Sequence, residues 1–420
     1  MLKKWRQSFC VPRAWSNRTS VCRVRGNPVF LTLLALGLGA VQWLPLLNVA
    51  PNRLVSGQGV SLWGVLQTVV SSSTWLNGFG VVAITLSCSA VWVRPSRLAR
   101  YGVLVLAWAL VLGLVTLTGA YASQVALLQS PIARTSWGSA FWVLVLCLCL
   151  IVMDALHRLQ LGLAVRAGVW ISLLCVVLGV LAGTGCEQLA IMKEYANHAE
   201  SFLPAIVRHL QIVALALLPS LCLGLPLGWL LNRHELLQRW LFPPLNIIQT
   251  IPSIALFGLL MVPLAWLAGT WPGLAELGIS GIGVAPAVIA LTLYSMLPVV
   301  RGTQAGLAQV PSAVLDAAQG MGMNTWQIFW WAQAPLALPV VLAGVRTATI
   351  QTVGLAAVAA LIGAGGLGAI MFDGLFGNAQ DVVLLGVLPI LGLALLVNLG
   401  FAMLSECLPA PAEGGRFDPI

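Results

Sequence analysis

Charged residues are scarce in this sequence. Asp, Glu, Lys and Arg make up 8% of its 420 residues, whereas they make up about a quarter of an ordinary soluble domain. Hydrophobic residues make up 59%, and the mean hydropathy is +0.95. A disordered chain, a coiled coil and a soluble enzyme all require more polar residues. The composition therefore excludes these three classes.

The sequence also lacks the cysteine spacing of a disulfide framework or a metal site. Most of its nine cysteines lie inside apolar runs, where cysteine acts as a small apolar side chain. The net charge of +9 does not indicate nucleic-acid binding, because that function needs a basic patch on a folded polar surface. We therefore expect no metal, cofactor or nucleic acid as a ligand.

Long stretches without a charged residue dominate the sequence instead. A helix that crosses a membrane needs roughly 20 mostly apolar residues, and a charge at its centre costs about 3 kcal/mol. These rules predict an all-α, polytopic protein with about ten transmembrane helices in the lipid bilayer. The expected helices cover residues 29–47, 76–93, 102–119, 138–156, 167–186, 206–231, 245–267, 283–300, 339–363 and 382–403.

The basic residues support this helix count, because Lys and Arg of short loops accumulate on the cytoplasmic side. With the N-terminus inside, 16 basic residues fall on the cytoplasmic side and four outside, and Arg346 lies within a helix. The first helix follows a basic tail and is not followed by a small-residue cleavage site. The sequence therefore predicts a membrane anchor rather than a removable signal peptide, with both termini cytoplasmic.

The predicted helices fall into two groups of five. Residues 187–204 are rich in charge and predict an external amphipathic connector that is solvated. The expected divisions are a basic tail at 1–27, an N-terminal membrane region at 28–186, this connector, a C-terminal core at 205–405 and a tail at 406–420.

The helices lack the groups that would power transport on their own. An ion-coupled carrier is expected to place ionisable groups at mid-membrane, whereas Asp154 and Arg346 both lie toward cytoplasmic helix ends. An ATPase would need a P-loop with Gly-Lys-[Ser/Thr], and none of the three lysines is followed by Ser or Thr. Any energy must therefore come from another subunit.

The cytoplasmic segment at 301–338 is unusually long for this chain. Pro311 and Ser312 predict the start of a short helix within it, and Gly320 and Gly322 predict its end. A short helix with small side chains can be held in the cleft of a partner protein.

This segment resembles the EAA motif of permease subunits of ATP-binding-cassette (ABC) importers. The tripeptide at 316–318 is Asp-Ala-Ala, followed by Gly322 and, thirteen residues later, by Pro335, as in E-A-A-x-x-x-G and then I-x-L-P. Asp316 replaces the usual Glu and keeps its charge, while Ala332 and Ala334 replace Ile and Leu.

Further matches are similar to the osmoprotectant branch, which transports glycine betaine, choline or proline betaine. They lie at 208–210, 224–228, 248–253, 293–301, 320–323, 343–348 and 361–368. The resemblance covers about half of the chain, and the N-terminal half is similar to a subgroup with an extended N-terminal membrane region. It implies a type I importer core in a bacterial inner membrane, paired with a second permease subunit, separate ATPase subunits and an external substrate-binding protein. It implies no enzyme activity of the chain itself.

Three sets of candidate site residues follow. The resemblance assigns coupling to the ATPase to Asp316, Ala317, Ala318, Gly320, Gly322 and Pro335. The polar residues of the core helices are divided between interhelical hydrogen bonds and a translocation path, for which the candidates are Gln249, Thr250, Ser253, Tyr294, Ser295, Thr347 and Gln351. A gate or close helix packing, rather than a dinucleotide site, is expected at Gly363, Gly365, Gly366 and Gly368.

Other functions stay open on the sequence alone. The chain could be an ABC permease for another small amine or an amino acid, and the alternatives of a different class are a secondary carrier and a membrane scaffold. The lack of intramembrane ionisable pairs argues against the carrier. The N-terminal helices could serve regulation, oligomerisation or targeting.

Overall fold

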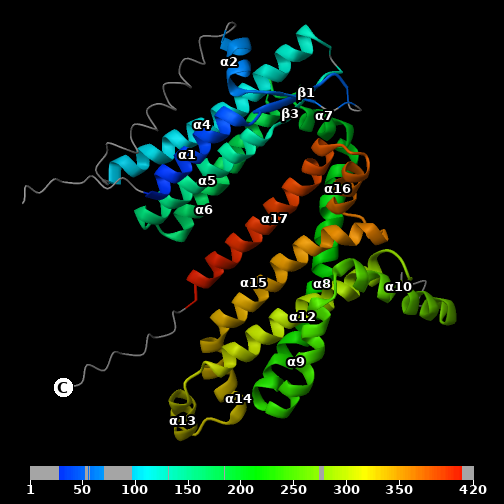
Figure 1. The fold of residues 1–420 in the computed structure, drawn as a ribbon. Helices are drawn as coiled ribbons and strands as arrows, with labels where there is room; N and C mark the ends of the chain where they lie inside the picture. Colours follow the sequence, from blue (N-terminus) through cyan, green and yellow to red (C-terminus); the bar gives the residue numbers. More distant parts are fainter. Residues whose placement is uncertain are drawn as a thin grey trace, which may run out of the picture.

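A computed structural model of the protein describes residues 28–52, 55, 57–70, 97–130, 132–183, 185–273 and 279–408. Figure 1 shows two groups of long helices, an N-terminal one that runs to α6 and a C-terminal one that begins at α8. Among the described residues, eight helical stretches are long and apolar enough to cross a membrane. The tail predicted at 1–27, the helix predicted at 76–93 and residues 409–420 lie outside the described residues.

The N-terminal region packs its helices around one core of aliphatic side chains, which includes Leu47, Leu114 and Ile151. Its helices are α1 (Pro28–Trp43), α2 (Leu62–Val70), α4 (Arg97–Leu128), α5 (Ser139–Leu159) and α6 (Leu163–Ala182). A small antiparallel sheet caps one end of this bundle in the order β2–β1–β3 (Figure 1). Its strands are β1 (Leu47–Ala50), β2 (Gln58–Val60) and β3 (Arg134–Trp137).

The sheet adds strands to the predicted all-α fold and corrects the helix expected at 29–47. Helix α1 ends at Trp43, because Pro45 has no backbone N–H with which to continue it. The residues that follow pair as β1, with Leu47 opposite both Val60 and Trp137. An apolar run alone does not separate a buried strand from a helix.

The C-terminal core is built around α8 (Ala199–Arg233), α12 (Val284–Ala308) and α15 (Ala334–Val358). Helix α12 packs against both of the others, and glycines bring the backbones together. A Cβ atom at Gly302 of α12 would lie 2.7 Å from the Cα of Gly344 on α15. A Cβ atom at Gly228 of α8 would lie 2.6 Å from the Cβ of Thr303. These three helices therefore form a tightly packed body.

Shorter elements surround this body. They are α7 (Ala190–Asn197), α9 (Glu235–Thr250), α10 (Ser253–Thr270), α13 (Ser312–Gly320), α14 (Thr325–Ile328), the π-helix η1 (Phe329–Gln333), the 3-10 helix η2 (Ala359–Ile362), α16 (Leu367–Phe376) and the long α17 (Gln380–Glu406). In Figure 1, α13 and α14 lie at the opposite end of the molecule from α7 and α16.

Three predicted boundaries in the C-terminal half are corrected. The helix expected at 245–267 is two helices, because Pro252 forces Ile251 into an extended conformation with ψ 129°. The segment expected outside the membrane helices at 301–338 is shorter, since α12 continues to Ala308 and α15 already begins at Ala334. Residues 199–204 of the predicted connector form the start of α8.

The contact between α12 and α15 generates a stability prediction. We expect Gly344→Ala to lower the free energy of unfolding by about 2 kcal/mol, because the new methyl group overlaps backbone atoms that cannot move aside. The measurement is the midpoint of thermal unfolding of the purified protein in detergent, which should fall by several degrees. Gly354→Ala is the matched control on the same helix, because a Cβ atom there meets nothing within 4 Å. Equal midpoints for the two variants would contradict the close contact.

Candidate coupling and gating sites

The short helix α13 presents one face to solvent and packs the other against the core. Asp316 and Ala317 are exposed, whereas Ala318 is 3% exposed. Leu315 packs into a cluster with Leu307 of α12 and Ala337 of α15. The helix is therefore anchored to two long helices while its acidic face stays accessible.

A glycine ends α13. Gly322 has φ +82°, a left-handed conformation that residues with a side chain avoid. The N–H of Gly322 donates to the carbonyl of Gln319 at 2.9 Å, and that of Met323 to the carbonyl of Ala318 at 3.2 Å. A Cβ atom at Gly320 or Gly322 would meet nothing within 4 Å. Both glycines therefore leave open space beside the exposed face of α13.

The sixth coupling candidate, Pro335, lies apart from α13 in the first turn of α15. Because proline has no N–H to donate to the preceding turn, the chain before it forms the wider turn of the π-helix η1, in which Ala334 N–H donates to the carbonyl of Phe329. Trp326, Trp330 and Trp331 beside it are exposed. The structure thus places five of the six candidates in and directly after one short helix.

Two of the polar path candidates hold the break between α9 and α10. The hydroxyl of Tyr294 donates to the carbonyl of Ile251 at 2.5 Å, and the side-chain amide of Gln249 donates to the backbone carbonyl of Tyr294 at 2.5 Å. Tyr294 itself is 4% exposed. These groups therefore tie the break to α12, and their polar atoms are engaged.

The other path candidates differ in exposure. Ser295 is buried and donates to the carbonyl of Leu291 in its own helix at 2.8 Å. Thr250 and Thr347 are exposed, and each hydroxyl donates within its own helix. Ser253 and Gln351 are half-buried. The candidates that keep accessible surface are thus Gln249, Thr250, Ser253, Thr347 and Gln351.

The glycine-rich segment forms a turn between η2 and α16. Gly363, Gly365 and Gly366 have φ of +81°, +81° and +82°, which only glycine adopts readily. Gly368 serves packing instead, because a Cβ atom there would overlap the carbonyl of Ala357. We call residues 363–366 the glycine turn.

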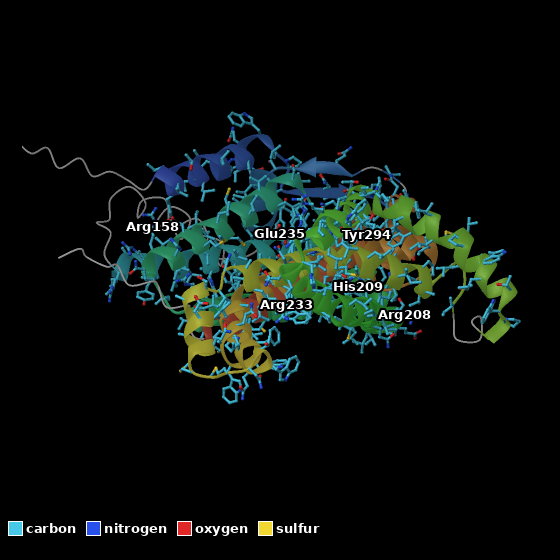
Figure 2. The ribbon with its side chains drawn as sticks, turned by 90° about the horizontal axis from the view of Figure 1, so that it is seen from below. Arg158, Arg208, His209, Arg233, Glu235 and Tyr294 are labelled. Atoms are coloured by element: carbon cyan, nitrogen blue, oxygen red, sulfur yellow. The ribbon has the colours of Figure 1, made fainter. Side chains whose placement is uncertain are left out.

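Two neighbouring residues of α8 hold the glycine turn. Arg208 Nε donates to the carbonyl of Ala364 at 3.2 Å. His209 is fully buried, and its Nε2 lies 3.1 Å from the carbonyl of Val353, to which it donates. A Cβ atom at Gly366 would lie 3.2 Å from the Cα of His209. Figure 2 labels both residues on α8, whose other end is marked by Arg233.

The sequence reasoning missed two polar arrangements. Arg346 of α15 donates from Nε to Oδ1 of Asn398 on α17 at 2.9 Å, and Nη2 donates to the same oxygen. The sequence offers the signal of one arginine within an apolar run, but it does not reveal an asparagine partner 52 residues away.

The second arrangement joins the two halves of the chain. Arg134 Nη1 lies 2.5 Å from Oε1 of Glu194, and Ser136 Oγ donates to Oδ2 of Asp381 at 2.7 Å. Lys193 Nζ donates to the carbonyl of Ala133 at 3.0 Å, and burial together with the nearby Arg134 charge lowers the pKa of Lys193. The predicted solvated connector therefore carries a buried carboxylate, because Glu194 is 1% exposed.

Both halves of the chain match known families. Residues 24–192 match the N-terminal domain of ABC transporter permease YehY. Residues 220–406 match the family described as binding-protein-dependent transport system inner membrane component. The second match contains α13, the glycine turn and α17.

Curated relatives match the C-terminal half. The chain is 42% identical over 191 residues to the osmoprotectant import permease protein OsmW of Salmonella typhimurium, an alignment that covers 46% of this chain and 84% of that protein. It is 32% identical over 225 residues to the glycine betaine/carnitine/choline transport system permease protein OpuCD of Bacillus subtilis. That alignment covers 53% of this chain and 91% of OpuCD. A solved structure of the MetNI methionine ABC transporter in an inward-facing conformation is also similar. The match covers 50% of this chain and 96% of the chain in that structure, with 23% sequence identity and a TM-score of 0.44.

Proposed function

Since the chain belongs to the osmoprotectant-import family of ABC transporter permeases, we propose that it is the membrane permease subunit of an ATP-driven importer for a small quaternary amine or betaine. The observation that carries the proposal is the anchored helix α13 with its exposed acidic face. ATP hydrolysis belongs to separate ATPase subunits, and substrate is delivered by a separate external binding protein.

Helix α13 is suited to transmit movement of an ATPase. Its exposed residues Asp316, Ala317 and Gly320 are small or acidic and leave room for a partner surface. Its buried residues Leu315 and Ala318 connect it to the ends of α12 and α15. A displacement of α13 therefore passes directly to the packed body of the core.

The accessible polar residues suit a zwitterionic substrate. Thr250, Ser253, Thr347 and Gln351 are neutral and keep accessible surface. A betaine carries no net charge, so it can pass along a path lined by neutral dipoles without a fixed counter-charge. Tyr294 and Ser295 act as supports of that path, because their hydroxyls already donate to backbone carbonyls. Gln249 keeps accessible surface and also donates to the carbonyl of Tyr294. The glycine turn and Gly368 form the gate at the other end of α15.

The chain lies in the inner membrane with both termini in the cytoplasm. This orientation puts α13 on the ATPase side and the glycine turn, β3 and α7 on the outer side. The core pairs with a second permease subunit, identical or homologous. The five N-terminal helices and the core are two structural units in this proposal, joined by the connector at 187–204 and by the contacts of α17 with the N-terminal region.

The rival functions make different demands on the membrane helices. A secondary carrier is expected to place coupled ionisable groups at mid-membrane, whereas Arg346 pairs with the neutral amide of Asn398. A membrane scaffold gives no reason for an exposed acidic helix anchored to two spans. A permease for another small amine or an amino acid shares every feature of the core and is separated by substrate tests.

Uptake by the complete complex tests the proposed function. We expect proteoliposomes that contain this chain, its ATPase and its binding protein to accumulate labelled glycine betaine or choline when ATP is present on the ATPase side. A labelled amino acid serves as the comparison substrate. Accumulation without the ATPase would show a carrier, and accumulation of the amino acid alone would show a different substrate class.

Coupling through α13 is tested at the glycine that ends it. We expect Gly322→Asp to abolish ATP-driven uptake, because it adds bulk and charge to the partner surface that α13 presents. Gly392→Ala on α17 is the control, since it fills equally open space within a helix outside the coupling candidates, where alanine is favoured over glycine. Normal uptake by Gly322→Asp at equal amounts of inserted protein would disprove the coupling assignment.

The orientation is tested with reporter fusions. A reporter that works only in the cytoplasm should be active after Gly322 and after Ile420, because both positions lie on the side rich in Lys and Arg. A reporter that works only after export should be active after Asn197 and after Gly273. Cytoplasmic behaviour of the fusion after Asn197 would show that the division into five and five helices is wrong.

A further inference from the structure

A largely half-buried polar cluster joins the N-terminal region to the last helix of the core. It consists of Arg134 and Ser136 on β3, Glu194 on α7 and Asp381 in the first turn of α17, and we call it the polar clasp. The bond between Ser136 and Asp381 connects residues 245 positions apart. Figure 1 shows β3 and α7 at the end of the molecule where α16 and α17 meet.

The clasp fixes this contact through one fully buried carboxylate and three half-buried side chains. Glu194 is 1% exposed and is paired with Arg134, which holds α7 against β3. A buried charge that loses its partner is strongly unfavourable. The bond between Ser136 and Asp381 holds β3 against α17. Leu384 and Leu388 of α17 extend the contact, because both pack on the core of the N-terminal region.

Helix α17 moves together with α16, because glycines bring their backbones into contact. A Cβ atom at Gly374 of α16 would lie 2.5 Å from the backbone nitrogen of Val383. A Cβ atom at Gly386 of α17 would lie 2.7 Å from the backbone nitrogen of Met371. Interiors packed this closely transmit displacements. The two helices therefore form one stiff hairpin, with the clasp at its α17 side.

The hairpin begins at the glycine turn. Gly366 directly precedes α16 and lies against the backbone of His209, and Arg208 holds the carbonyl of Ala364 in the same turn. A shift of the first turn of α17 must therefore change the contact between the glycine turn and α8. The clasp, the hairpin and the glycine turn form a continuous physical connection.

We infer that Arg134 and Ser136 are positioning residues for transport, through which the N-terminal region holds the glycine turn against α8. This inference rests on the proposed function of the core as an ATP-driven importer. Without the clasp, the hairpin of α16 and α17 shifts, and the glycine turn loses its contact with α8 even when no ATP is hydrolysed. The consequence is a loss of coupling, so that more ATP is hydrolysed for each substrate molecule imported.

The first test measures coupling in the complete complex in proteoliposomes. Ser136→Ala and Asp381→Ala should each lower the ratio of substrate imported to ATP hydrolysed about fivefold, the lower range of couplings between distant sites. The exchange Ser136→Asp with Asp381→Ser should restore the ratio, because the same bond then forms in reverse beside Arg134. Ser172→Ala is the matched control, since that hydroxyl donates within its own helix.

The second test reads the gate directly and does not depend on the substrate. Ala364 is 2% exposed, so the thiol of an Ala364→Cys variant should be protected from a membrane-impermeant maleimide added outside. Ser136→Ala and Asp381→Ala should raise its labelling rate about fivefold, and the exchange should restore protection. Labelling at residue 364 is quantified by peptide mass spectrometry, so native cysteines do not interfere.

The two tests separate failure of this inference from failure of the proposed function. ATP-driven uptake with an unchanged coupling ratio and unchanged labelling in Ser136→Ala and Asp381→Ala, at equal amounts of assembled complex, would overturn the role of the clasp. An exchange variant that assembles but stays uncoupled would overturn it as well. A wild-type complex that imports none of the amines, but whose labelling at residue 364 follows the clasp, would instead overturn the proposed substrate class.

Discussion

The need to satisfy every backbone polar group without water governs this structure, since irregular backbone is tolerated in a membrane only where other groups pair with it. The break before α10 is closed by the Tyr294 hydroxyl on the carbonyl of Ile251. The glycine turn is closed by Arg208 on the carbonyl of Ala364. These two departures from a continuous helix therefore each carry a polar partner, and each lies at a place where we propose movement or passage of substrate.

The long helices between these irregular sites behave as rigid elements. Contact between Gly302 and Gly344 joins α12 to α15 without intervening side chains, and such interfaces shift between discrete arrangements rather than deform smoothly. Helix α13 is attached to one end of this body through Leu315, and the glycine turn follows the other end of α15. In the proposed mechanism, a push at α13 thus reaches the glycine turn as one movement of packed helices.

The long spans could be predicted from the sequence because charged residues are excluded from them. The end of α13 could be predicted as well, because glycine favours the backbone conformation that ends a helix. The sequence did not reveal the break at Ile251, because the apolar run continues across it. It did not reveal β1 either, since Leu47 and Val49 are as apolar as the helix before them. Local pattern also did not reveal which polar side chains of the core make interhelical hydrogen bonds, because the bond between Gln249 and Tyr294 spans 45 residues.

Charged residues are scarce in this chain, and several of them form the polar contacts between its structural units. The local sequence pattern places Glu194 in a solvated connector and Asp381 at the start of an apolar run. Their partners lie 60 and 245 residues away, so local pattern cannot reveal that both carboxylates pair with β3. An unpaired charge in such surroundings is strongly unfavourable, and the structure accordingly pairs charge where rigid units meet. Substitutions at these joints should alter how the units move together before they unfold either unit, because the apolar packing inside each unit does not depend on them.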